Sequence, residues 1–257
     1  MSSQRRIGLI VPSSNTTMET ELPEMFRRRS ERTGEVFTWH SARARMSHVT
    51  PEELDRMVQA SDVSAQSLAD APVEVIAYAC LVAVMVRGVG AHVAVHERLS
   101  EALQDSPRQP PIVTSAGALI DGLAVLGAQR IGIVTPYMLP LAEQVAAYIS
   151  GEGVEVCEMV ALEISDNIEV GRISSDTLVS SARKVAERGG IDALVLSCCV
   201  QMPSLDVVQV IEDEIGIPVL TAATATARSI LLGLGLSPEI PNAGALLSTR
   251  VATDPAA

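Results

Sequence analysis

Aromatic and basic residues are both scarce in this chain of 257 residues. Aromatic side chains make up 2 % of it, which argues against the stacking platforms by which proteins bind single-stranded nucleic acid. The 19 basic residues are outnumbered by 31 acidic residues, and the net charge is −12. A surface of that sign repels phosphate backbones and anionic membranes. We therefore expect neither nucleic acid nor a membrane as a partner.

Long apolar runs and cysteine pairs are missing as well. No run approaches the roughly 18 apolar residues that a membrane span needs, and the apolar stretch 7–11 is too short for a signal peptide. Four cysteines without C-x-x-C spacing do not make a disulfide framework. The sequence therefore predicts a cytoplasmic protein in which any role of the cysteines is chemical.

Motifs for nucleotide cofactors, metals and serine catalysis are also missing. The segment VPSSNTT after the first apolar run is neither GxGxxG nor GxxxxGKS, and no GxSxG occurs. His92 and His96 have helical i, i+4 spacing but lack the glutamate of HExxH, so we interpret them as part of a solvated helix face. His40 and His48 are interpreted as ordinary polar residues. We expect no cofactor and no metal.

Short apolar runs rich in Val and Ile alternate with helical patterns along the whole chain. Such runs are typical of parallel strands that are buried on both faces of a sheet. The expected strands are residues 7–11, 36–40, 73–79, 112–114, 131–135, 154–160, 193–197 and 219–221. Capping boxes at 16–19 and 50–53, and N-caps at Ser174 and Ser204, predict the starts of four helices. The fold class is α/β.

The two halves of the chain resemble each other. IGLIVPSSN from Ile7 matches IGIVTPYML from Ile131, and VEVIAYACLVAVM from Val73 matches IDALVLSCCVQMP from Ile191. The offset shrinks from 124 to 118, as changes in loop length would leave between two copies of one unit. The duplication predicts two flavodoxin-like lobes with parallel sheets, related by a pseudo-two-fold axis. A TIM barrel built from two half-barrels is the alternative.

Two cysteines fall on equivalent positions of this duplication. Cys80 and Cys198 each follow an apolar strand directly. Ligands of open α/β sheets bind beyond the carboxyl ends of the strands, so these thiols should face each other across a cleft between the lobes. Such a pair can attack or deprotonate a small molecule on one side and protonate it on the other. Alternatively they are small buried hydrophobes, as we interpret Cys157, and Cys199 is an ambiguous neighbour.

Three segments resemble the maleate cis-trans isomerases, a family of the cofactor-free aspartate/glutamate racemase superfamily. They read VPSSNTTMETE, ACLVAVM and LSCCVQMPS, and the resemblance covers roughly residues 5–235. It implies that Cys80 is the nucleophile and that Cys198 is the second catalytic cysteine. The groups that it implies for binding the substrate carboxylates are the side chains of Asn15, Tyr137 and Asn167 and the backbone amides around Leu81, Val82, Cys199 and Val200.

The same resemblance implies the organisation of the chain. The first lobe comprises residues 1–110 and is completed by about 223–257, and the second lobe comprises 111–222. The site lies in the cleft between them, and a loop at about 43–50 closes over the substrate. The protein is expected to be a homodimer. Its substrate is expected to be a small dicarboxylate.

The expected reaction is the isomerisation of maleate to fumarate. The Cys80 thiolate adds to C2, Cys198 protonates C3, the succinyl-cysteine rotates about its new single bond, and elimination releases fumarate. An amino-acid racemase, an arylmalonate-type decarboxylase and a non-catalytic dicarboxylate-binding protein are the alternatives. Racemases of this fold carry an acidic residue where this chain has Asn15, which can donate to a carboxylate. The decarboxylases need only the cysteine of the second half, so the presence of Cys80 argues against them.

Overall fold

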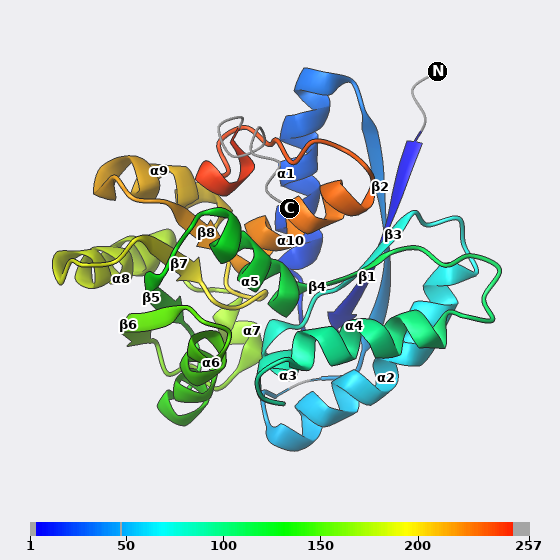
Figure 1. Ribbon diagram of the computed structural model, residues 1–257, viewed down its shortest axis with the longest axis horizontal. Helices are drawn as coiled ribbons and strands as arrows, with labels where there is room; N and C mark the ends of the chain where they lie inside the picture. Colours follow the sequence, from blue (N-terminus) through cyan, green and yellow to red (C-terminus); the bar gives the residue numbers. More distant parts are fainter. Residues whose placement is uncertain (1–3, 47, 249–257) are drawn as a thin grey trace.

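Two parallel four-stranded sheets form the frame of the molecule (Figure 1). The computed structural model describes residues 4–46 and 48–248. The strand order is β2-β1-β3-β4 in the first sheet and β6-β5-β7-β8 in the second. The strands are β1 Gln4–Pro12, β2 Val36–Ala44, β3 Val75–Tyr78, β4 Ile112–Thr114, β5 Arg130–Thr135, β6 Glu155–Ala161, β7 Ala193–Ser197 and β8 Val219–Thr221. All eight expected strands are present, and two separate open sheets exclude the barrel.

Helices cover both faces of each sheet. Helices α1 and α2 pack on the first sheet at β2, α4 packs at β4, and α6, α8 and α9 pack on the second sheet. The helices are α1 Met18–Thr33, α2 Pro51–Ala69, α3 Leu81–Met85, α4 Ala91–Ala102, α5 Ser115–Val125, α6 Leu139–Gly151, α7 Asn167–Val170, α8 Ser175–Glu187, α9 Leu205–Ile215 and α10 Ala222–Gly233, with a 3-10 turn at Ala245–Leu247. Among the described residues, no helix is both long and apolar enough to cross a bilayer.

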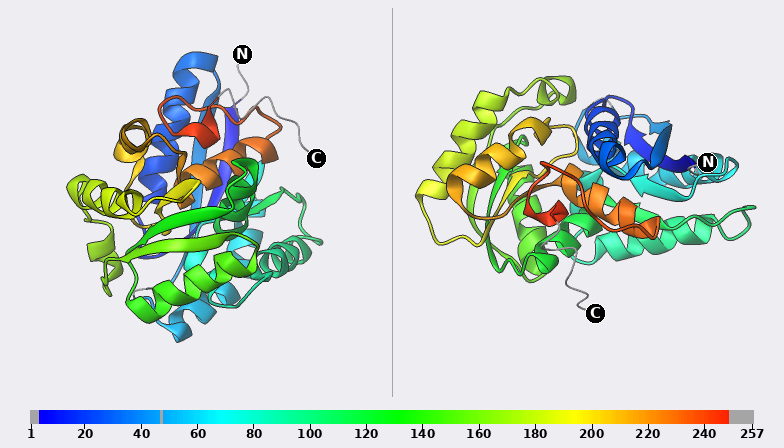
Figure 2. Two further views of the ribbon diagram at one scale, coloured as in Figure 1. Left: turned by 60° about the vertical axis from the view of Figure 1, so that its left-hand side comes forward. Right: turned by 90° about the horizontal axis from the view of Figure 1, so that it is seen from above.

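The chain crosses between the sheets twice. Strand β4 pairs with β3, so the first crossing follows Thr114, and the expected boundary at 110/111 falls one strand too early. It was misplaced because a three-residue strand gives little sign of which sheet it joins. After β8 the chain returns, and α10 packs on β3, β4 and α1. Helices α5 and α10 lie side by side between the two sheets (Figures 1 and 2).

Two of the four predicted helix starts have the expected cap. The side chains of Thr50 and Ser174 accept hydrogen bonds from backbone N–H groups three residues further on. The capping box predicted at 16–19 is wrong: α1 begins after Thr17, whose side chain makes no cap hydrogen bond and whose hydroxyl donates to a backbone carbonyl of the second lobe. The Asn15 side chain takes the capping position and accepts from the N–H of Met18 at 3.1 Å. The side chain that caps this helix, that of Asn15, therefore lies outside the predicted capping box.

A carboxylate of the first lobe caps the N-terminus of α9 in the second lobe. Glu21 Oε1 accepts hydrogen bonds from the N–H groups of Ser204 at 2.5 Å and Leu205 at 2.6 Å. The predicted cap by the Ser204 side chain is therefore wrong, because Glu21 occupies that place. Burial raises the pKa of Glu21 from 4.5 to about 7, although both backbone hydrogen bonds oppose the rise.

We expect Glu21→Gln to remove one pH dependence of stability. The folded protein holds the Glu21 proton more tightly than the unfolded chain, so this group lowers the free energy of unfolding as pH rises from about 4.5 to about 7. A rise of that size is worth about 3 kcal/mol. Glutamine keeps the accepting oxygen and cannot ionise. Urea unfolding at pH 5, 6, 7 and 8 should show the variant gaining about 3 kcal/mol on the wild type.

Glu24→Gln is the matched control for this measurement. Glu24 lies on the same helix, and its hydrogen bond to Arg27 lowers its pKa to about 2. It titrates below pH 5, so its variant should differ from the wild type by a constant amount between pH 5 and pH 8. A Glu21→Gln variant that also differs by a constant amount would contradict the raised pKa.

Candidate active site

Three thiols and one phenol meet where β3, β5 and β7 end. Cys80 begins α3, Cys198 and Cys199 follow β7, and Tyr137 follows β5. All four side chains are buried. Desolvation is the largest cause that raises the pKa of Tyr137, and the three thiols raise it further. Cys199 also forms a hydrogen bond with the Tyr137 hydroxyl. The structure therefore brings these four predicted residues together at the carboxyl ends of the strands, where parallel sheets bind ligands.

A bulge in β7 changes the match between the two cysteine segments. The pairing of β7 with β8 shifts by one residue between Val195 and Ser197. Before the bulge, the pair Ile7–Val75 in the first sheet corresponds to the pair Ile131–Ala193 in the second. Val75 and Ala193 are 118 positions apart, which is the offset between the two cysteine segments in the sequence. An extra residue in one strand displaces everything after it by one position.

Hydrogen bonds beyond the bulge identify the spatial counterparts. The N–H of Ala79 donates to Ile10 at 2.8 Å, and the N–H of Cys198 donates to Val134 at 3.0 Å. Ile10 and Val134 are matched residues of β1 and β5, so Cys198 is the counterpart of Ala79. Cys199 is then the counterpart of Cys80.

The surroundings of the two neighbouring cysteines differ in the same sense. Cys199 Sγ accepts from the N–H of Gln201 at 3.4 Å and is hydrogen-bonded to Tyr137, and both bonds favour its thiolate. Desolvation is nevertheless the largest cause and raises the pKa of Cys199. For Cys198 both causes, burial and the neighbouring Cys199, raise the pKa. Cys199 thus has hydrogen-bond partners that favour its thiolate, whereas Cys198 has none among its causes.

Burial favours the neutral form of the Cys80 thiol. Desolvation raises its pKa from 9.0 to about 12, with a smaller rise from Cys199. A hydrogen bond from the N–H of Ala83, in the first turn of α3, acts in the opposite direction. The thiolate is the reactive form of cysteine, so Cys80 must lose its proton as it attacks.

Both predicted carboxylate-binding asparagines are buried beside the loop between β1 and α1. Asn15 lies in this loop, and its Nδ2 donates to the carbonyl of Val200 in the second lobe at 3.1 Å. Asn167 begins α7, and its Nδ2 donates to Ser14 Oγ at 2.7 Å. Each amide nitrogen carries two hydrogens, so each can donate a second bond to a ligand.

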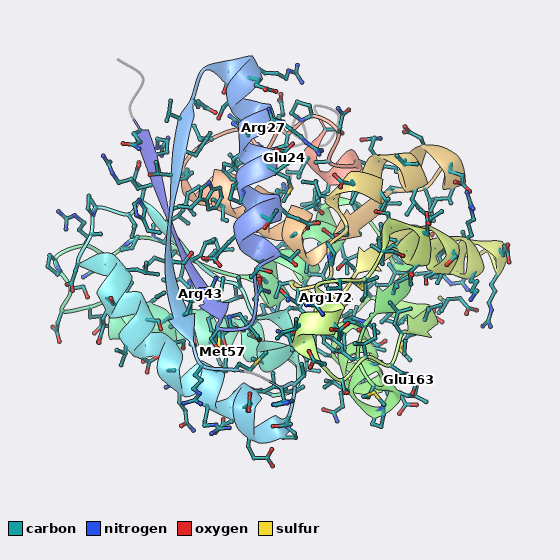
Figure 3. All side chains as sticks on the ribbon, turned by 180° about the vertical axis from the view of Figure 1, so that it is seen from behind. Glu24, Arg27, Arg43, Met57, Glu163 and Arg172 are labelled. Atoms are coloured by element: carbon teal, nitrogen blue, oxygen red, sulfur yellow. The ribbon has the colours of Figure 1, made fainter. Side chains whose placement is uncertain are left out.

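The predicted closing loop at 43–50 has two parts. Arg43 belongs to β2 and holds the loop between β1 and α1 by donating to the carbonyls of Ser13 and Asn15 at 2.9 and 3.1 Å. Figure 3 shows Arg43 at the end of β2, with Arg172 after α7 in the second lobe. Residues 48–50 line a cavity of about 600 Å³ that also reaches Tyr137. Residue 47 lies outside the described residues.

Gln201 is a buried polar residue of the site that the sequence did not point out. Its Nε2 donates to the carbonyls of Ser14 and Asn167, and its Oε1 accepts from the N–H groups of Thr16 and Thr17. A single polar side chain inside the apolar segment CCVQMP was the available signal. Its partners could not be foreseen, because they lie more than 30 residues away in the chain.

Other residues singled out in the sequence lie apart from the thiols. His92 hydrogen-bonds the Tyr148 hydroxyl at 2.5 Å and is mostly buried, so interpreting it as part of a solvated face was wrong. Cys157 is half-buried on β6. Within residues 4–46 and 48–248 no group of three or more His, Cys, Asp or Glu side chains could hold a metal ion.

Known proteins with similar sequence and structure are maleate isomerases and arylmalonate decarboxylases. The family described as arylmalonate decarboxylase matches residues 7–247. A maleate isomerase from Geobacillus stearothermophilus is 49 % identical over 251 residues, which are 97 % of this chain and 100 % of that protein. The maleate isomerase Iso of Pseudomonas putida S16, solved with maleate as a cysteine-to-alanine variant, superimposes with a TM-score of 0.93 at 47 % identity, covering 96 % and 98 % of the two chains.

The structure of a second relative was solved with a covalent intermediate. It is the Nocardia farcinica maleate cis-trans isomerase, a cysteine-to-serine variant with a covalently bound succinylcysteine intermediate. Its TM-score is 0.91 at 49 % identity, and the match covers 95 % of this chain and 98 % of that one.

Proposed function

Because this chain belongs to the maleate isomerases within the arylmalonate decarboxylase family, we propose that it converts maleate to fumarate through a succinyl-cysteine intermediate. The observation that carries the proposal is the meeting of Cys80 and Cys199 between the two lobes, with Tyr137 beside them. A carbon–carbon double bond does not rotate, so isomerisation needs a step that lowers its bond order. Addition of a thiol provides that step, and the intermediate described for the Nocardia relative is of this kind.

The first half of the reaction is an addition across the double bond. The Cys80 sulfur forms a bond to C2 of maleate, and the electron pair of the double bond moves to C3. Cys199 protonates C3, and the proton that leaves Cys80 restores the Cys199 thiol. The product is a succinyl group on Cys80, so protons and charge are conserved. A neutral resting Cys80 agrees with this coupled transfer, because no separated thiolate has to exist in a buried site.

The second half reverses the addition after a rotation. The bond between C2 and C3 is now single, and the C3 carboxylate turns to the trans side. As the bond between C2 and the Cys80 sulfur breaks, Cys199 gives its proton to that sulfur and takes a proton from C3, and the double bond between C2 and C3 forms again. Charge that develops on the C3 carboxylate needs hydrogen-bond donors that are already in position, as in an oxyanion hole.

We assign those donors to the groups that the family resemblance implies. Asn15, Tyr137 and Asn167 can each offer a side-chain donor. The backbone amides of Leu81 and Val82 lie in the first turn of α3, where N–H groups have no partner within the helix. The amides of Cys199 and Val200, which follow β7, complete the set. We propose Cys199 in the role that the resemblance implies for Cys198, because the hydrogen bonds beyond the bulge make Cys199 the counterpart of Cys80.

We also infer that the enzyme acts without a cofactor, in the cytoplasm and as a homodimer, and that it binds no nucleic acid. Four free cysteines support a reducing compartment, since a disulfide would remove the nucleophile. The net charge of −12 supports the last inference. Light scattering of the purified protein tests the dimer by its mass.

A proton NMR time course of the purified, reduced protein with maleate and no added cofactor tests the proposal. We expect the maleate vinyl signal to be replaced by that of fumarate. Absence of fumarate would reject the isomerase. Deuterium exchange at the α-carbon of amino acids would then identify a racemase, and binding of dicarboxylates without exchange would identify a binding protein.

A further inference from the structure

We propose that Gln201 is a positioning residue that sets the distance between the two carboxylate-binding asparagines. The proposal rests on the function proposed above and concerns a side chain with no part in its chemical steps. Gln201 is 3 % exposed and lies two residues after Cys199. Its side-chain amide and its backbone N–H together contact three separate segments of the site.

The first segment is the loop between β1 and α1, which carries Asn15. Gln201 Oε1 accepts from the N–H of Thr16 at 3.1 Å and from that of Thr17 at 3.5 Å, and Nε2 donates to the carbonyl of Ser14 at 3.2 Å. The backbone of Gln201 adds to this contact, because its carbonyl accepts from the Thr17 hydroxyl at 2.7 Å. The loop is thus held on both sides of Asn15 by one residue of the other lobe.

The second segment is α7, which carries Asn167. Gln201 Nε2 donates its other hydrogen to the carbonyl of Asn167 at 3.0 Å. The third segment is the turn after β7 that carries Cys199, since the N–H of Gln201 donates to Cys199 Sγ at 3.4 Å. The side-chain amide of Gln201 therefore joins the loop that carries Asn15 to α7, and the backbone N–H of the same residue contacts the second thiol.

The partners of Gln201 fix which way its amide points. Its oxygen faces two N–H groups and its nitrogen faces two carbonyl oxygens. In a flipped amide the nitrogen would face the two N–H groups and the oxygen would face the two carbonyls, so all four hydrogen bonds would be lost. Glutamate has the same shape but no amide hydrogens. At neutral pH it would set a buried carboxylate against two carbonyl oxygens, and when protonated it could restore one of the two donated bonds.

Gly171 leaves the room in which this amide lies. A Cβ added at Gly171 would lie 2.7 Å from Gln201 Nε2, whereas the backbone of Gly171 is in the right-handed helical region, which alanine adopts freely. Gly171→Ala therefore displaces the amide nitrogen without altering Gln201 itself. It provides a second way to disturb the same hydrogen bonds.

Both variants should weaken the use of substrate far more than they weaken the fold. Misplacing a substrate-binding group by about 1 Å can cost on the order of 100-fold in rate. For Gln201→Glu we expect kcat/KM for maleate to fall by about 10- to 100-fold at pH 8, mainly through a higher KM. The deficit relative to the wild type should shrink as pH falls toward 6, because the buried acid protonates. Gly171→Ala should raise KM in the same way but without that pH dependence.

Gln66→Glu is the matched control. Gln66 on α2 also donates its side-chain amide to a backbone carbonyl, that of Ala102 at 3.0 Å, but at the surface and away from the thiols. This variant should keep the wild-type KM at every pH. Alkylation of Cys80 by uncharged iodoacetamide should proceed at the wild-type rate in all three variants, because that reagent needs no carboxylate site.

The outcomes separate this inference from the proposed function. A wild type that makes no fumarate rejects the function. A wild type that makes fumarate, with folded Gln201→Glu and Gly171→Ala variants within about threefold of its KM, overturns the positioning role. A loss in kcat alone, or an equal loss in iodoacetamide reactivity, also overturns it, since either points to a general disturbance of the thiols. If Gln201→Glu does not fold, the Gly171→Ala result decides.

Discussion

Cys80→Ala should lower the rate of fumarate formation by about 10⁴-fold or more. Removal of the nucleophile from an enzyme that works by covalent catalysis leaves only binding and charge stabilisation, and losses on this scale follow. Here the loss should be nearly complete, because maleate bound without a bond to sulfur keeps its double bond and cannot rotate. Initial rates from the NMR time course, with the variant at high concentration, measure the effect.

Two further measurements make this result specific. Intact-protein mass spectrometry of the wild type quenched during turnover should show a fraction carrying the mass of one maleate, and the Cys80→Ala protein should show none. Cys157→Ala is the control, since this half-buried thiol lies on β6 away from Cys80 and its loss should leave the rate unchanged. A Cys80→Ala protein that retains a tenth of the wild-type rate would reject Cys80 as the nucleophile.

The second large effect is expected at Cys199 and not at its neighbour. Cys199→Ala should lose about 10²- to 10⁴-fold in kcat, the usual contribution of a general acid or base. Cys198→Ala should remain within about threefold of the wild type. Cys198 is fully buried, so its substitution should instead lower the free energy of unfolding by about 1 kcal/mol.

The comparison of these two adjacent residues tests the register of the structure. Equal expression and similar stability make the two variants controls for each other. If Cys198→Ala shows the larger loss, Cys198 is the second catalytic thiol, as the sequence alignment of the two halves implies. The register beyond the bulge would then have identified the wrong residue. If both lose activity equally, the segment acts as a unit and neither residue has the role alone.

The inner strands could be predicted because they are apolar runs between polar turns, whereas β2 and β6, at the sheet edges, also contain polar residues. The same cannot be said of the contacts between the lobes. Glu21 and Asn15 begin helices that nearby serine or threonine residues were expected to cap, and these choices depend on which side chains the fold brings near. Local sequence does not record such distant partners, so the capping box at 16–19 and the cap at Ser204 were predicted wrongly.

The candidate site divides in the same way. Its two cysteine segments were evident from the duplication, and Asn15, Tyr137 and Asn167 from the family resemblance. The bulge left no mark, because the segment from Ala193 to Ser197 has no glycine or proline to signal an irregular strand. An extra residue in one of two matched strands displaces the residues that follow it, and here it separates Cys198 from Cys199.

The two crossings of the chain have a thermodynamic consequence. Helix α10 comes from the end of the sequence but packs on β3 and β4, while α5 leaves the first sheet and Gly122 within it lies against Leu220 of β8. Neither lobe can lose its structure without exposing apolar surface of the other. The molecule should therefore melt in one all-or-none transition, although its architecture looks like two bodies. The urea titrations of the Glu21 variants would report it as a single midpoint common to all spectroscopic probes.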